Sequence, residues 1–174
     1  VQVGDAFGWE VEMDDNGRVI AGAYGEDIRL ENGSYRANSG AAYVFSQDGG
    51  VWSDEAKLTS SLVQSGAYFG YSVDIDGDVI AVSAHRMNLR NAADNNRQDY
   101  GAVFVFRFDG TTWNEVARID NPYVEETQTK RFGLDVELQG EWLFVSSDRD
   151  ESGCANIGQV DMFRFNASGT PTGD

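Results

Sequence analysis

The acidic run at residues 148–151 is the part of the sequence best suited to binding a metal ion. It reads Asp148-Arg149-Asp150-Glu151. Carboxylate oxygens that lie close together in sequence can share one hard cation such as Ca²⁺. Asp148, Asp150 and Glu151 are therefore the candidate metal ligands, and a solvated acidic loop is the alternative interpretation.

A second acidic string, Asp74, Asp76 and Asp78, surrounds a single glycine, Gly77. A protein loop that wraps a calcium ion supplies several oxygen ligands and is about twelve residues long in an EF-hand. Asp76-Gly77-Asp78 is long enough only for a tight turn between two strands. We therefore expect these aspartates to be turn and solvent-facing residues, with no Ca²⁺ at turns of this kind and no other cofactor.

His85 and Cys154 are the only residues of their types in the chain. A zinc site or a catalytic triad would need further His or Cys partners, so we expect a surface or loop-packing role for His85 and a buried free thiol at Cys154. An intermolecular disulfide is the alternative for Cys154. Paired carboxylates for glycoside hydrolysis stay open as a possibility, but nothing singles out two of the 29 acidic residues. We expect no enzymatic activity.

Tyrosines in polar segments are the candidates for ligand binding. Five of them lie in or beside such segments: Tyr24, Tyr35, Tyr68, Tyr100 and Tyr123. Aromatic rings can stack on the faces of sugar rings, and they can equally bury large areas between neighbouring structural elements. The first use predicts a carbohydrate-binding surface, and the second predicts packing.

The elements that must position these residues are three copies of one hairpin. Residues 69–84, FGYSVDIDGDVIAVSA, alternate apolar and polar side chains on both sides of a tight turn, which is typical of two antiparallel strands. Related sequences occupy residues 7–23 and 132–147. The Phe-Gly pairs that open them lie 62 (69 − 7) and 63 (132 − 69) residues apart. This regular period indicates a repeat architecture.

Two further strands follow the hairpins in the same order. A Gly-Ala or Gly-Gln strand is predicted at residues 40–45, 101–106 and 158–165, and a Trp-containing strand at 51–58 and 113–119. The large aromatic residues of the repeat are expected in the core or between repeats: Phe7, Phe69, Phe132, Trp52 and Trp113. The longer connections of each repeat should emerge on one rim, where we expect the functional surface.

Four short antiparallel strands per repeat are the pattern of a propeller blade. We predict an all-β chain of three tandem blades, at about residues 7–58, 69–119 and 132–165, with a tail at 166–174. The third blade is expected to lack a fourth strand, because the tail has no Trp-containing counterpart. Closed propellers have about four to eight blades. The chain is therefore expected to form an open arc or part of a larger β-propeller.

The Phe-Gly openings, the hairpins and strands such as GAVFVF at 101–106 resemble FG-GAP repeats of the integrin α-subunit propeller type. The resemblance extends from Phe7 to Phe165. It implies a β-propeller with an extracellular role in adhesion or recognition. Integrin-type blades often hold Ca²⁺ in a loop between their first two strands, where this chain has only short turns, and the Gly-Ala-Pro signature of the family is missing.

Charge and composition limit the partners. The 29 acidic and 13 basic residues give a net charge of −16, which disfavours nucleic acid and anionic membrane surfaces. No apolar run approaches the roughly 20 residues of a membrane-spanning helix, so no membrane insertion is expected. Sequons begin at Asn32 and Asn166 and are possible N-glycosylation sites. We expect a secreted or cell-surface protein.

The function predicted from these observations is that of a non-enzymatic, structural or adhesive module. Its expected partners are further propeller blades or other copies of the chain, which would complete a closed ring or extend a filament. A neighbour's residues 1–3 are expected to supply the missing strand by β-augmentation. Glycans or extracellular proteins are alternative partners. A carbohydrate-binding propeller is the second interpretation, and a glycan-processing enzyme the third.

Overall fold

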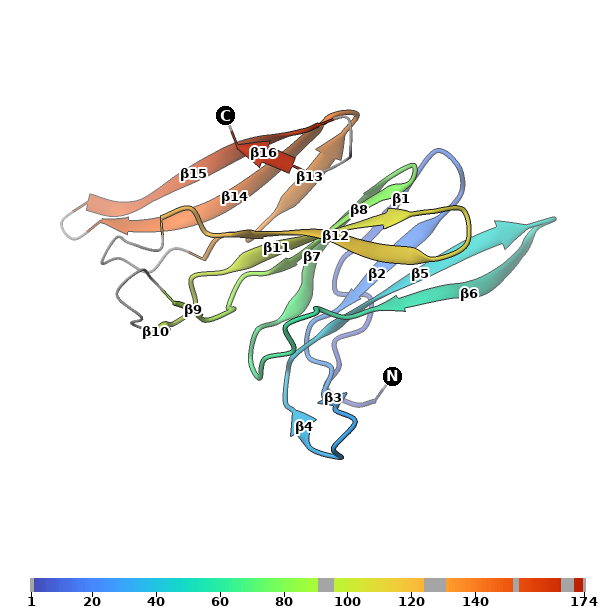
Figure 1. The fold of residues 1–174 in the computed structure, drawn as a ribbon, viewed down its shortest axis with the longest axis horizontal. Helices are drawn as coiled ribbons and strands as arrows, with labels where there is room; N and C mark the ends of the chain where they lie inside the picture. Colours follow the sequence, from blue (N-terminus) through green and yellow to red (C-terminus); the bar gives the residue numbers. More distant parts are fainter. Residues whose placement is uncertain (1, 91–95, 124–130, 152–153, 167–170, 174) are drawn as a thin grey trace.

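The computed structural model describes residues 2–90, 96–123, 131–151, 154–166 and 171–173. These residues form strands and turns without a helix. They build three four-stranded antiparallel sheets that lie side by side, and two small hairpins project from them (Figure 1). No sheet is closed. The prediction of an all-β chain of propeller blades in an open arrangement is confirmed.

Each sheet is an up-and-down meander of four strands, and the sheets are called blades 1, 2 and 3 in chain order. Blade 1 contains β1 (Val11–Met13), β2 (Val19–Ala23), β5 (Ala41–Asp48) and β6 (Val51–Leu58). Blade 2 contains β7 (Phe69–Asp76), β8 (Val79–Ala84), β11 (Ala102–Phe108) and β12 (Trp113–Asp120). Blade 3 contains β13 (Val136–Gln139), β14 (Trp142–Glu151), β15 (Cys154–Phe165) and β16 (Pro171–Gly173).

Small hairpins interrupt the long connections between the second and third strands of blades 1 and 2. In blade 1, β3 (Ile28–Arg29) pairs with β4 (Tyr35–Arg36), and in blade 2, β9 (Leu89–Arg90) pairs with β10 (Asn96–Arg97). Two-residue strands are too short to show an alternating pattern, so the sequence predicted only polar loops here.

Blade 3 has a fourth strand, and the prediction that it lacks one is therefore wrong. β16 pairs antiparallel with β15, with Phe163 opposite Gly173 and Phe165 opposite Pro171. The strand has only three residues, too few for an apolar alternation that a sequence pattern could reveal. Proline fits this place because an edge strand leaves one row of N–H groups unpaired. A strand from a neighbouring chain is not needed at this edge.

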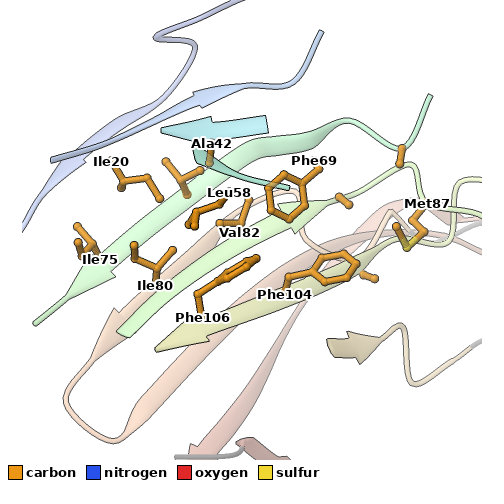
Figure 2. Packing of buried hydrophobic residues seen from close by; sticks show 14 of the residues in the cluster. Ile20, Ala42, Leu58, Phe69, Ile75, Ile80, Val82, Met87, Phe104 and Phe106 are labelled. Atoms are coloured by element: carbon orange, nitrogen blue, oxygen red, sulfur yellow. The ribbon is translucent and has the colours of Figure 1, made fainter. Parts of the chain in front are cut away.

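Blade 2 buries a different face against each neighbour, because successive side chains of a strand point to opposite faces of its sheet. One face packs on blade 1, as Figure 2 shows for residues from the two blades: Ile20, Ala42 and Leu58 of blade 1 with Phe69, Ile75, Ile80, Val82, Phe104 and Phe106 of blade 2. On the opposite face, Ala81, Val103 and Val105 pack on Phe132, Leu143 and Val145 of blade 3.

The phenylalanines of the second and third Phe-Gly pairs anchor their blades. Phe69 and Phe132 are fully buried. Phe69 makes an edge-to-face contact with Phe104 at a centroid distance of 5.5 Å, and Phe132 does so with Phe163 at 6.0 Å. Phe7 and Trp52 are expected in the core or between repeats, but nothing in the described part of the chain covers them, and they are 43% and 48% exposed. No other described part of the chain packs on their side of blade 1.

Glycine is required where one blade begins beside the third strand of the preceding blade. Gly40 has a φ of +87°, and a Cβ added to it would lie 1.9 Å from the carbonyl oxygen of Phe69. Gly101 repeats this arrangement, with a φ of +84° and a distance of 2.1 Å to the carbonyl oxygen of Phe132. The close approach lets the Phe69 and Phe132 N–H groups donate to carbonyl oxygens of the preceding blade, each at 3.0 Å. These contacts explain why glycine opens the third strand of both repeats.

Candidate functional site

Side chains of β7 bind the main chain of the next blade's first strand. The N–H of Val136 donates to Ser72 Oγ at 3.0 Å, that of Leu138 donates to Asp74 Oδ2, and that of Gly140 donates to Asp76 Oδ2 at 2.7 Å. β13 is the edge strand of its sheet, so its outward N–H groups need acceptors. Residues at every second position of β7 supply them.

The position of Asp74 corrects the prediction that it faces solvent. Its side chain is buried, with 9% of the residue exposed. The alternation that places Val73 and Ile75 against blade 1 turns Asp74 toward the edge of blade 3. Asp76 is exposed at the turn as expected, and its carboxylate also binds blade 3.

The first strands of the three blades gather carboxylates along one side of the molecule. Burial is the largest cause that raises the pKa values of Glu10, Glu12, Asp74 and Glu137, and repulsion from neighbouring carboxylates, including Asp135, raises them further. Glu10 is held by the N–H of Val73 in blade 2. In the described part of the chain, no group of three or more His, Cys, Asp or Glu side chains has the arrangement of a metal site.

Asp148, one of the predicted metal ligands, is half-buried and paired with an arginine. Its carboxylate accepts from Arg131 Nε at 3.0 Å, and the Arg131 guanidinium forms an ion pair with it. The side chains of Asp150, Glu151 and Cys154 lie outside the described part of the structure. The metal site at 148–151 therefore stays a prediction.

Aromatic side chains from blades 1 and 2 form a continuous cluster, here called the rim strip: Trp9, Tyr24, Tyr68, Tyr71 and His85. Trp9 contacts Tyr24 at a centroid distance of 5.1 Å and Tyr71 at 5.7 Å. Tyr24 lies 5.2 Å from Tyr68 and 5.6 Å from Tyr71. His85 completes the strip, with its ring 4.0 Å from Tyr71 and 5.8 Å from Tyr68.

The repeat itself assembles the rim strip. Trp9 and Tyr71 each follow a Phe-Gly pair, and Tyr24 and His85 each follow the last residue of a blade's second strand. Packing of neighbouring blades brings these equivalent positions together. Tyr68 has a φ of +58°, which is uncommon for a bulky residue. Its N–H donates to the carbonyl oxygen of Asn38 at 3.2 Å, so blade 1 holds this strained tyrosine in place.

His85 forms the floor of the rim strip. Only 4% of the residue is exposed, and its Nδ1 atom has no hydrogen-bond partner among the described residues. Burial, followed by the positive charges of Arg131 and Arg86, lowers the pKa of His85 to about 4. The imidazole is therefore neutral at neutral pH. Its loop-packing role agrees with the sequence-based expectation.

Two arginines flank the strip, and each is paired with an aspartate. The Arg86 guanidinium lies over the Tyr68 ring at 5.1 Å and donates to Asp99 at 3.1 Å. Arg131, paired with Asp148, is close enough to His85 to lower its pKa. The strip thus combines apolar ring surface with groups that donate and accept hydrogen bonds.

The structure separates the five tyrosines that were candidates for ligand binding. Tyr24 and Tyr68 lie in the rim strip. Tyr35 is exposed on the β3–β4 hairpin, Tyr100 is buried, and Tyr123 donates to Asp161 at 2.7 Å. Sequence reasoning missed Trp9 and Tyr71 as members of a ligand surface. Their shared place after the Phe-Gly pairs was the signal that could have found them.

The candidate glycosylation sites lie at the surface. Asn32 is exposed in the turn between β3 and β4, where its Oδ1 atom accepts from the N–H of Ser34 at 3.0 Å. Asn166 is exposed after β15, and Ser168 of its sequon lies outside the described residues.

Apolar side chains are exposed or half-buried at both ends of the blade stack. The incoming face of blade 1 is the face that would meet a preceding blade: Phe7, Val11, Met13, Phe45 and Trp52. The outgoing face of blade 3 is the face that would meet a following one: Phe144, Val160 and Met162. Val19 joins Phe45 and Trp52 around an apolar hollow on the incoming face.

Comparison with known proteins identifies the repeat. A family model described as the FG-GAP repeat matches residues 1–45 and 52–106, which cover most of the first blade and most of the second. A search of curated proteins gives no match. The described residues include no helix with the length and apolar character that a membrane crossing requires.

Proposed function

Because the chain belongs to the FG-GAP repeat family, whose repeats are those of integrin-type β-propellers, we propose that it is an extracellular, non-enzymatic module with a structural or adhesive role. The module associates with further copies of itself through the two ends of its blade stack.

The observation that carries this proposal is the exposed incoming face of blade 1. Phe7 makes the same edge-to-face contacts with Tyr43 and Phe45, at 5.4 and 6.2 Å, that Phe69 makes with Phe104 and Phe106 in blade 2. In blade 2 this arrangement is buried against a neighbouring blade. In blade 1 it is open to solvent, and Met13 on the same face is 64% exposed. Monomeric soluble proteins rarely leave large contiguous apolar patches uncovered.

The outgoing face of blade 3 offers the complementary half of a blade contact. Glu137 and Gln139 occupy the positions equivalent to Asp74 and Asp76, which accept hydrogen bonds from the first strand of the next blade. Both are exposed. They can accept from the outward N–H groups of β1 in a second copy. Such a head-to-tail contact closes into a ring or continues as a filament, depending on the rotation between copies.

Surface features support an extracellular setting. The Asn32 sequon is exposed at the turn of a hairpin, and N-glycosylation is a surface modification of secreted proteins. The net charge of −16 keeps the surface soluble and disfavours binding to nucleic acid.

The oligomeric state tests the proposal. Light scattering coupled to gel filtration should give a mass that rises with concentration above the 19.1 kDa of one chain. The double variant Val11→Thr/Met13→Thr removes apolar surface from the incoming face and should shift the mass toward that of a monomer. Leu62→Thr changes an exposed apolar residue outside both end faces and is the matched control. A folded wild-type chain that stays monomeric at every concentration would refute self-association, as would equal losses in both variants.

A further inference from the structure

We propose that the rim strip is a binding site for a glycan chain. Trp9 and Tyr24 provide the ring surface on which sugar rings stack, and His85 with the Arg86–Asp99 and Arg131–Asp148 pairs binds sugar hydroxyl groups. The site lies apart from the two end faces and does not depend on self-association.

The stacking surface is continuous across two blades. Centroid distances of 5.1 to 5.7 Å link Trp9, Tyr24, Tyr68 and Tyr71 without a gap. Trp9 is 54% exposed, and the three tyrosines are half-buried. A row of rings at the surface suits an extended ligand with apolar faces. A pyranose has such a face, formed by its C–H groups, and its hydroxyl groups lie around the edge of the ring.

Two arginine–aspartate pairs border the strip and can form hydrogen bonds with sugar hydroxyl groups. A hydroxyl both donates and accepts a hydrogen bond, and an arginine beside a carboxylate offers both functions at one place. The Arg86 and Asp99 side chains are 42% and 35% exposed, and those of Arg131 and Asp148 are 49% and 30% exposed. Each pair therefore keeps part of its hydrogen-bonding capacity available to a ligand.

His85 places an unpaired polar atom beneath the rings of the rim strip. Its ring is buried beneath Tyr68 and Tyr71, and the Nδ1 atom has no partner among the described residues. Native proteins rarely leave a buried polar atom unpaired, since the unmade hydrogen bond costs free energy. A water molecule held between Nδ1 and a ligand hydroxyl would pair this atom and link it to the site.

The local charges favour a sugar over the other ligands that aromatic surfaces bind. An aromatic surface can also receive a cation, but Arg86 already covers the Tyr68 ring at 5.1 Å and Arg131 adds a second positive charge nearby. The Tyr68 ring is therefore already occupied by a cation of the protein itself. Nucleic acid bases also stack on aromatic rings, but their phosphates are disfavoured by the net charge of −16.

Affinity measurements with defined glycans test the site. An array of neutral glycans would first identify a bound chain, and calorimetry with a soluble hexasaccharide such as cellohexaose or xylohexaose would follow. Trp9→Ala should weaken binding at least tenfold. Tyr35→Ala removes an exposed aromatic side chain from the β3–β4 hairpin, outside the rim strip and both end faces, and should leave the affinity unchanged. Absence of binding across the array, or equal losses in the two variants, would overturn the proposal.

A second variant tests His85. His85→Phe keeps an aromatic ring against Tyr71 but removes the nitrogen, and it should lower the affinity at least fivefold with the circular dichroism spectrum unchanged. An unchanged affinity would refute the role of Nδ1. Because the incoming face is untouched by these variants, their effect on glycan binding is separable from any effect on self-association.

Discussion

Substitution of Gly101 by alanine should disrupt the contact between blades 2 and 3. Two costs add at this position. Gly101 has a φ of +84°, and a left-handed conformation costs an L-residue about 1–2 kcal/mol. The new Cβ would also lie 2.1 Å from the carbonyl oxygen of Phe132, whereas ordinary contacts begin at 3.4 Å.

The second cost can be worked out from this distance. Relief of the clash requires a backbone shift of about 1.3 Å (3.4 − 2.1). The shift would break the hydrogen bond from the Phe132 N–H to the Tyr100 carbonyl oxygen, now 3.0 Å long, and would move the fully buried Phe132 ring. The total loss should exceed about 4 kcal/mol, a range reached only by substitutions with an identifiable steric or burial defect.

Gly110→Ala is the matched control in the same blade. Gly110 has a φ of +94° but no atom within 4 Å of the added Cβ. Its substitution should therefore lower the free energy of unfolding only by the conformational cost of about 1–2 kcal/mol. Urea unfolding followed by circular dichroism gives both free energies of unfolding. If the two variants lose the same stability within about 0.5 kcal/mol, the close approach of the blades at Gly101 is not a constraint in solution, and the reasoning fails.

Two further predictions concern the buried rings. Phe69→Ala should lower the free energy of unfolding by about 3–5 kcal/mol, as expected for a fully buried phenylalanine. Phe7→Ala at the equivalent, half-exposed position should lower it by about 1–2 kcal/mol. Urea titrations at low protein concentration measure both values. Equal costs would mean that Phe7 is covered in solution. For His85, the pKa of about 4 in the folded state against an ordinary value of 6.5 means that the unfolded chain binds the extra proton between these values. His85 therefore removes up to about 3 kcal/mol of stability as the pH falls from 6.5 to 4. The difference in unfolding free energy between the wild-type protein and His85→Phe, measured at pH 7.5 and pH 4, should change by that amount, and a pH-independent difference would contradict it.

The parts of the fold that repeat could be predicted from the sequence. The strands β7 and β8 follow from alternation around a short turn, and three copies in register predict the blades because each unit must bury the same faces. Whether an individual side chain is buried or exposed could not be predicted in the same way. Asp74 has the sequence context of a solvent-facing residue, and its burial depends on the edge of a blade 63 residues later, which alternation within one strand does not describe.

The residues of the candidate site could likewise be predicted only in part. The sequence placed Tyr24 and Tyr68 on one rim, but the rim strip depends on how far neighbouring blades rotate against each other, and that rotation is set by contacts such as Gly40 with Phe69. The exposure of Phe7 is equally invisible in the pattern, because its sequence context matches that of the buried Phe69. β16 could not be predicted from the sequence, because its three residues are too few to show an alternation of apolar and polar side chains.

Each blade contacts only its neighbours along the chain, and this determines where local unfolding begins. In the described structure, blade 2 alone is covered on both faces. Local unfolding of a linear array begins at its ends, where a unit has one neighbour to lose. Amide hydrogen exchange should therefore be slowest in β8 and β11 and fastest in β1 and β16. A copy bound to either end would slow exchange in the blade that it covers, so protection would spread along the stack one unit at a time.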